Sequence, residues 1–229
     1  EATGTLDLTA ELGNALAGQV ALVDSALTLP GQRAALSDLQ ARLPLSETGA
    51  VAVAGAVRDL SRAARFAPAR FALEGRREGA QLTLAGAAEL PGAPPLPLEA
   101  EADLSVGTAR LRLTPTRLAF RRGGLQPAAL VPSLAAMGTA EGTVRISAEA
   151  ALADGALRTA ADIALLDLSL TTATAEIAGL SGRFRLAALA PPASAGPQEL
   201  TAREVVAGVP LAGGARAVSY THLTLPTKR

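Results

Sequence analysis

The side chains that most often carry out chemistry in proteins are scarce in this sequence of 229 residues. There is no cysteine and a single histidine, His222, close to the end of the chain. A histidine-based triad or metal site therefore lacks its central group. The segment Gly179-Leu180-Ser181-Gly182 is not a nucleophile elbow, which needs Gly-x-Ser-x-Gly leading into a helix. It is instead predicted to be a glycine-rich turn between strands.

Carboxylates offer the remaining candidates for chemistry. Glu99 and Glu101 alternate with apolar residues, which places them on one side of a predicted strand, about 7 Å apart. Nothing else polar converges on them, so a solvated outer face explains them better than acid/base catalysis. Asp154 precedes Gly155, and this pair is typical of a tight turn rather than of a metal ligand. We predict that the protein is not an enzyme and holds neither a metal nor a cofactor.

Composition narrows the class of partner. Hydrophobic residues make up 49% of the chain but aromatic residues only 2%, so the apolar surface consists of Ala, Leu and Val. The formal net charge is zero, which gives no electrostatic reason to expect nucleic acid as a partner. The longest uncharged run, residues 123–140, is broken by prolines and glycines, so no membrane-spanning helix is expected.

The elements that must position any site are predicted to be strands, because the dominant pattern has period two. The clearest hairpin has Val144, Ile146 and alternate residues to Leu152 on one face, and Leu157 to Leu165 on the return strand. Asp154-Gly155 supplies the turn between them. The adjacent pair Leu165-Leu166 breaks the alternation and indicates a bulge or corner.

Helix signals are few. Residues 127–137 begin with proline, carry Leu130, Leu134 and Met137 at helical spacing, and are followed by Gly138. Pro132 should bend or split this segment into one or two turns. Residues 31–43 also have leucines at helical spacing and predict either a second short helix or a strand.

Strands that are apolar on one side need something to cover that side. Two solutions remain open from the residues alone. Two sheets can cover each other in a sandwich, which is the commoner arrangement, or one sheet can curl into a groove whose interior holds an apolar ligand.

The segment 177–218 narrows this choice, because it carries an ordered set of turn and strand residues. These are Gly179, Gly182, Phe184, Leu189, Pro191, Pro192, Pro197, Gln198, Gly208, Pro210 and Leu211. With residues 125–136 and 141–170, this set resembles the YdbH-like family of AsmA-type envelope proteins. The resemblance covers residues 125–218, while residues 1–124 share with the family only a general composition and strand pattern.

The resemblance implies an all-β fold: a long, antiparallel, twisted sheet curled into a taco-like hydrophobic groove, with one or two short helices. It implies a lipid conduit that carries phospholipids across the periplasm between the inner and outer membranes. The partners would be acyl chains and the inner membrane, through an anchor missing from this fragment; an outer-membrane partner is unidentified. The alternative function is a structural or adhesive β-rich surface or passenger module with a closed sandwich core.

Ten residues are expected to line such a groove, and a closed core is the competing role for each. They are Leu82, Leu84, Leu111, Leu113, Val144, Ile146, Ile163, Leu165, Phe184 and Leu186.

The predicted organisation has four parts. Residues 1–90 form an N-terminal β segment, 91–97 a Pro-rich loop, and 98–218 a YdbH-like β segment with a short helix near 127–137. Residues 219–229 contain the only Tyr, His and Lys of the chain and resemble a translated sequencing adapter.

Overall fold

The fold is all-β and antiparallel, as predicted. The computed structural model describes residues 2–12, 16–189, 192–207 and 223–224. Within these ranges the strands belong to one hydrogen-bonded sheet that does not close on itself. The strand order is linear from β1 to β11, and β12, β13 and β14 all pair with β11. The chain divides into unit 1, Glu1–Thr114 with Glu149–Arg158, and unit 2, Pro115–Ala148 with Thr159–Arg229. Strands β8, β9 and β10 contribute residues to both units.

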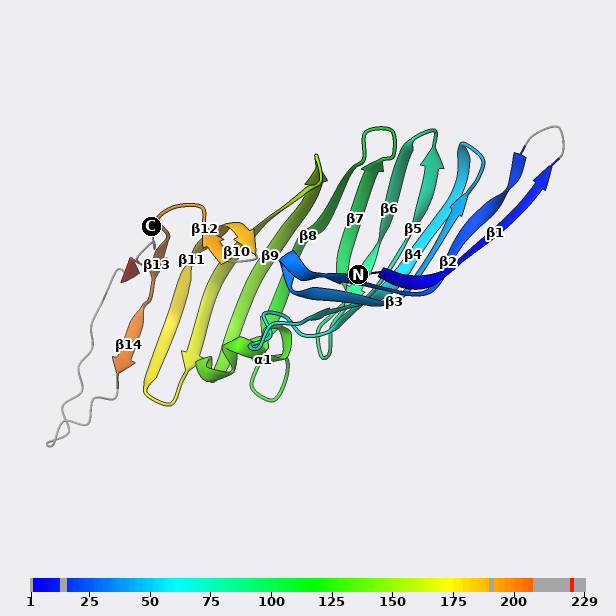
Figure 1. The fold of residues 1–229 in the computed structure, drawn as a ribbon. Helices are drawn as coiled ribbons and strands as arrows, with labels where there is room; N and C mark the ends of the chain where they lie inside the picture. The colour runs from blue at the N-terminus through cyan, green and yellow to red at the C-terminus, as the bar shows by residue number, and fades with distance from the viewer. Residues whose placement is uncertain (1, 13–15, 190–191, 208–222, 225–229) are drawn as a thin grey trace, which may run out of the picture. The chain divides into compact units, whose positions relative to one another are not determined.

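Unit 1 is a meander in which each strand pairs with the next along the chain (Figure 1). The regular alternation and the short connections of the sequence favour this arrangement of successive hairpins. The η1 turn, Pro30–Gln32, separates the second and third strands. The strands are β1 Ala2–Leu12, β2 Leu16–Leu29, β3 Ala34–Pro44, β4 Thr48–Asp59, β5 Ala69–Glu78, β6 Gln81–Glu89, β7 Leu96–Asp103 and β8 Thr108–Phe120.

Unit 2 continues with longer strands and a short helical segment. The tight turn at Asp154-Gly155, which belongs to unit 1, is confirmed, since β9 ends and β10 begins on either side of it. The predicted foreign tail lies outside the described residues except for 223–224, which form β15. The elements are β9 Thr139–Ala153, β10 Ala156–Thr171, β11 Ala175–Leu189, β12 Pro192–Ser194, β13 Glu199–Thr201, β14 Glu204–Ala207 and β15 Leu223–Thr224.

The helix predicted at 127–137 is confirmed and is split at the expected proline. Helix α1 spans Pro127–Leu130, and the 3₁₀ helix η2 spans Pro132–Met137. The Gln126 side chain fixes the start of this segment, because it donates to the Ala140 carbonyl (3.1 Å) and accepts from the Ala140 amide (2.8 Å). At the other end Gly138 passes so close to β10 that a Cβ atom there would lie 2.0 Å from the Thr171 carbonyl oxygen.

Irregularities inside strands decide two expectations from the sequence. Of the two outcomes left open for residues 31–43 the strand is observed, since Ala34–Pro44 is β3. The turn predicted at Gly179–Gly182 is wrong, since β11 runs through it. Gly179 has φ of 67° and lies where the register with β10 shifts, so it forms a bulge. The bulge predicted at Leu165-Leu166 is confirmed, because the register shifts between Leu165 and Leu168.

One end of β4 is held by a buried carboxylate. The Asp59 side chain has no exposed surface and accepts hydrogen bonds from the Ser61 amide (2.9 Å), the Arg65 amide (2.6 Å) and the Arg65 Nε (2.8 Å). The Arg65 guanidinium also donates to the Gln32 carbonyl at 2.5 Å. The hydrogen bond from the Arg65 side chain, with smaller help from Ser61, holds the pKa of Asp59 well below its usual range.

We predict that Asp59→Asn destabilises the protein at pH 7 by about 2 kcal/mol, because a charged hydrogen-bond acceptor is lost. The lowered pKa of Asp59 means that its contribution is complete above about pH 4 and disappears as the pH falls further. Thermal melting between pH 2 and pH 7 should therefore show a shallower acid loss in the variant than in the parent. Asp7→Asn, at an exposed position in β1, is the control. Identical acid profiles for Asp59→Asn and the parent would contradict this assignment.

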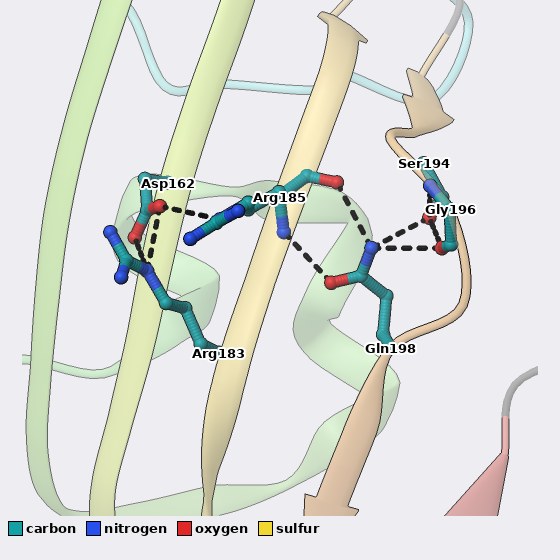
Figure 2. Close-up of polar contacts among 6 residues, drawn as sticks. All are labelled: Asp162, Arg183, Arg185, Ser194, Gly196 and Gln198. Carbon is teal, nitrogen blue, oxygen red and sulfur yellow. Dashed lines mark hydrogen bonds and ion pairs between the residues drawn. The ribbon is translucent and has the colours of Figure 1, made fainter.

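The polar face of β10 and β11 carries an ion-pair cluster (Figure 2). Arg183 Nε donates to both Asp162 carboxylate oxygens at 2.7 Å, and Arg185 Nε lies 3.5 Å from the same carboxylate. The Arg183 hydrogen bond lowers the pKa of Asp162. Both arginine side chains are more than half exposed, so the cluster contributes little stability but keeps this face polar.

The Gln198 side chain substitutes for a missing strand beside β11 (Figure 2). β12 pairs with β11 only at Leu186–Leu189, and β13 pairs with it only at Ser181 and Gly182. Between them, Gln198 accepts from the Arg185 amide (3.0 Å) and donates towards its carbonyl (3.4 Å). The amide nitrogen of Gln198 also donates to Ser194 Oγ and the Gly196 carbonyl, each at 2.9 Å.

We predict that Gln198→Ala opens the β11 edge locally and increases amide exchange at Arg185, because that amide loses its acceptor. Gln198→Glu is the matched variant, because it keeps the acceptor and loses the donor. Hydrogen–deuterium exchange by NMR should rank Arg185 exchange as parent, then Gln198→Glu, then Gln198→Ala. Equal exchange in all three proteins would show that the amide does not protect this edge.

Candidate functional site

The most extensive feature of unit 1 is a row of apolar side chains on one face of the sheet. Cross-strand pairs connect the strands: Val53 with Leu73, Leu84 with Ala100, and Ala100 with Leu111. Val51, Leu73 and Leu84 form its buried centre, with 4–9% of their surface exposed. We call this row the unit 1 apolar face, and its members are Leu43, Val51, Val53, Leu73, Leu82, Leu84, Leu98, Ala100, Leu111 and Leu113.

Glycines in neighbouring strands make room for the leucines of this face. Leu73 lies opposite Gly86, and Leu84 lies opposite Gly75. A Cβ atom would lie 1.9 Å from the Ala72 carbonyl oxygen at Gly86, and 1.9 Å from the Thr83 carbonyl oxygen at Gly75. The strands therefore approach too closely at these points for any side chain, and the leucines bury themselves against neighbouring backbone.

The opposite face of unit 1 is polar and alternates charge with alanine. Glu99 pairs in register with Arg112, and Glu101 with Arg110. Arg110 Nε lies 3.2 Å and Arg112 Nε 3.4 Å from the Glu149 carboxylate. Glu99 and Glu101 are both exposed, which confirms the solvated outer face expected for them.

Three hollows of the described surface lie mainly over the polar face. One of about 450 Å³ has a floor of small residues, including Ala54, Ala72 and Ala87, and charged residues such as Arg70 and Glu89 at its border. A larger one, of about 660 Å³, is bordered by Arg42 and Glu74 among others. These hollows arise where alanines lie between long charged side chains.

Within unit 1, no second layer of described residues covers the apolar face. The main packing partners of β1 to β7 are their neighbours in the sheet, together with a few next-but-one strands. A sandwich core would require a second sheet opposite these leucines, and all described strands belong to the same sheet.

Unit 2 carries a corresponding row on β10 and β11. Ile163 pairs with Phe184, Leu165 with Gly182, and Ala161 with Leu186. On β9, Val144 is 8% exposed and alternates with exposed Arg145. We call these residues the unit 2 apolar face: Val144, Ile146, Ile163, Leu165, Leu168, Leu180, Phe184 and Leu186.

The ten residues expected from the sequence divide between the two faces. Leu82, Leu84, Leu111 and Leu113 share the unit 1 apolar face, where Leu84 is buried and Leu111 is 39% exposed. Val144 and Leu165 are buried in unit 2, while Ile146, Ile163, Phe184 and Leu186 are half-buried. Their role in lining a lipid path stays a prediction.

Several members of the two faces were not among the expected residues. In unit 1 the centre includes Val51 and Leu73, which lie in alternating runs that the sequence shows. In unit 2, Leu168 and Leu180 are 4% and 6% exposed but follow strand irregularities, which hide them from a period-two pattern.

The described residues carry neither a metal-binding cluster nor an unpaired buried polar side-chain atom. No group of three or more His, Cys, Asp or Glu side chains is close enough within those ranges to hold a metal ion. Among the same residues, every buried side-chain nitrogen or oxygen has a hydrogen-bond partner.

Comparison with protein families identifies the chain. The YdbH-like family, described as intermembrane phospholipid transport protein YdbH, matches residues 2–220. The chain belongs to the YdbH-like family. Comparisons with curated proteins and with solved structures found no match.

Membership of the YdbH-like family gives the chain a role in intermembrane, periplasmic lipid transport. The family is one of lipid transport proteins. Among the described residues, no helix is both long and apolar enough to cross a membrane.

We predict that Gly86→Ala destabilises unit 1 by about 1–3 kcal/mol, because its Cβ atom would push the Ala72 backbone away and displace Leu73. Gly31→Ala is the matched control, since no atom lies within 4 Å of a Cβ built there. Urea denaturation should give a lower midpoint for Gly86→Ala and an unchanged midpoint for Gly31→Ala. Equal midpoints for the two variants would show that the close approach of β5 and β6 is not required.

Proposed function

We propose that this YdbH-like chain is a non-enzymatic conduit in which phospholipid acyl chains move along the apolar faces of the sheet. The observation that carries the proposal is the unit 1 apolar face, which crosses β3 to β8 without a covering layer among the described residues of unit 1. Acyl chains are occupants of the right chemistry for an uncharged row of Leu, Val and Ala side chains.

The driving force would be apolar area kept away from water, worth about 25 cal/mol per Å² for the protein face and the lipid tails alike. A row of similar aliphatic side chains suits movement, because no single position binds a tail much more tightly than the next. The polar face, with its Glu99–Arg112 and Glu101–Arg110 pairs, would stay in water.

The end of the row supports a wet border for lipid headgroups. Arg77 follows Leu73 and Gly75 at the same spacing along β5, so it ends the apolar row with a charge. Its guanidinium donates to the Pro44 carbonyl (2.9 Å) and the Gly79 carbonyl (2.8 Å), which keeps the charge at the hairpin end. In the proposal, tails lie over the leucines and headgroups remain near this border.

The wider context of the proposal comes from the family. The full-length protein would be anchored in the inner membrane and would deliver phospholipids towards the outer membrane, where its partner is unidentified. The competing function, a structural or adhesive module with a closed sandwich core, gains no support from a single sheet.

A photo-crosslinking residue placed on either face tests the proposal. We expect benzoylphenylalanine at Leu84 or Leu165 to capture phospholipid from vesicles of phosphatidylethanolamine and phosphatidylglycerol. The neighbours Thr83 and Leu166 are exposed and are the matched controls, with no capture expected. Equal capture on both faces, or none on either, would contradict an acyl path along the apolar faces.

Charged substitutions test transport itself. Ile146→Asp and Leu165→Arg place a charge in the apolar path and should strongly reduce lipid movement in cells at unchanged protein levels. Leu166→Arg, next to Leu165 and 43% exposed, should leave transport intact. Normal transport in all three variants would rule out the path through unit 2.

A further inference from the structure

Four aspartates adopt a backbone conformation that side chains rarely take. Of the described residues other than glycine, five have positive φ, and four of these are Asp24, Asp38, Asp154 and Asp167, with φ of 45–53°. Such values are costly for most residues and are tolerated best by Gly, Asn and Asp.

The same four aspartates share a sequence signature. Each ends an Ala-Leu-x-Asp tetrapeptide: Ala21-Leu22-Val23-Asp24, Ala35-Leu36-Ser37-Asp38, Ala151-Leu152-Ala153-Asp154 and Ala164-Leu165-Leu166-Asp167. The tetrapeptide occurs nowhere else in the sequence. The other aspartates, 7, 59, 103 and 162, lack the preceding Ala-Leu and do not have positive φ.

Three of the four lie inside strands at shifts of register. The pairing shifts between Leu22 and Ser25 in β2, between Ser37 and Gln40 in β3, and between Leu165 and Leu168 in β10. The fourth, Asp154, forms the tight turn with Gly155. One tetrapeptide therefore produces a bulge within a strand and a turn at a strand end.

The bulge changes which residues face the apolar side. In a regular strand Leu165 and Leu168 would point in opposite directions, yet they are 9% and 4% exposed, while Leu166 between them is 43% exposed. The extra residue sets the alternation forward by one position, so leucines before and after the bulge share a face.

Neighbouring strands are shaped to accept these bulges. A Cβ atom at Gly4 would lie 1.8 Å from Ser25 Oγ, one at Gly55 would lie 3.3 Å from the Ser37 carbonyl oxygen, and one at Gly142 would lie 2.7 Å from the Asp167 carbonyl oxygen. The amide of Asp167 itself donates to Ser181 Oγ at 3.1 Å. Each bulge thus has a glycine opposite it, which indicates that the bulges are specific features of the fold and not defects.

We propose that Ala-Leu-x-Asp is a bulge signal in this chain. Asp24, Asp38 and Asp167 are then positioning residues, which keep the side chains beyond each bulge on the apolar face. In unit 1 the bulges of β2 and β3 lie between Gly4 of β1 and Gly55 of β4, so the sheet bends locally along a line that crosses four strands. A role of these bulges in lipid transport rests on the proposed function. Their control over which side of the sheet the following side chains occupy does not.

Cysteine labelling tests the control of facing without lipid, because the chain has no cysteine of its own. Arg42→Cys is on the exposed side of β3 beyond the bulge, and Leu43→Cys is on the apolar side. The cysteine variants are made in the full chain, once with Asp38 kept and once with Asp38→Asn. In both backgrounds we expect maleimide to react about tenfold faster with a cysteine at position 42 than with one at position 43. With Asp38→Val, which disfavours positive φ, the ratio should fall towards one and the melting temperature should fall by about 5 °C.

Asp7→Val is the matched control, since Asp7 is an exposed strand aspartate that does not have positive φ, and valine favours strands. It should leave both the labelling ratio and the melting temperature unchanged. An Asp38→Val protein that labels and melts like Asp38→Asn would overturn the proposal.

A failure of Asp38→Val to fold would support the proposal if Asp38→Gly folds, because glycine adopts positive φ freely. A failure of both would overturn it. Correct labelling combined with no lipid crosslinking would overturn the conduit and leave the bulge signal intact.

Discussion

The rest of the structure depends on one constraint: an antiparallel sheet with an apolar side must have that side covered, and the described strands form one sheet rather than two facing sheets. Strands such as β4 to β7 therefore bury their leucines and valines against the backbone of their neighbours. Close approaches at Gly75 and Gly86 make this packing tight enough to bury Val51, Leu73 and Leu84. In the proposed function, apolar guest molecules cover the rest of this face.

The polar face of the sheet is exposed to water and carries weak ion pairs. Its partly exposed ion pairs, such as Arg183 with Asp162, contribute little to stability. They do specify which side of each strand meets water. Edges and ends are fixed by stronger polar groups, namely the buried Asp59 carboxylate and the Gln198 amide beside β11. Polar contacts at strand ends and close backbone approaches stabilise the sheet. The apolar faces are formed by a different set of residues.

Much of this could be predicted from alternation, because a period of two directly reports which residues share a face. The all-β fold, the Asp154-Gly155 turn, the split helix at Pro132 and the shared face of Leu82 and Leu84 follow from such local rules. The errors arose where bulges interrupt the period. Leu36 and Leu39 have helical spacing because the bulge at Asp38 adds a residue between them. The glycines around the bulge at Gly179 gave the sequence the pattern of a turn. A leucine that is buried opposite a glycine of the neighbouring strand gives no local sequence signal, because the pairing depends on the register between the two strands.

The central claim, that the apolar faces hold guest molecules, is tested most directly by native mass spectrometry of the full-length protein purified from membranes and transferred out of detergent. The account predicts mass additions that match individual phospholipids, with several lipids per protein. A folded protein that carries no lipid under conditions in which other lipid carriers keep theirs would contradict it.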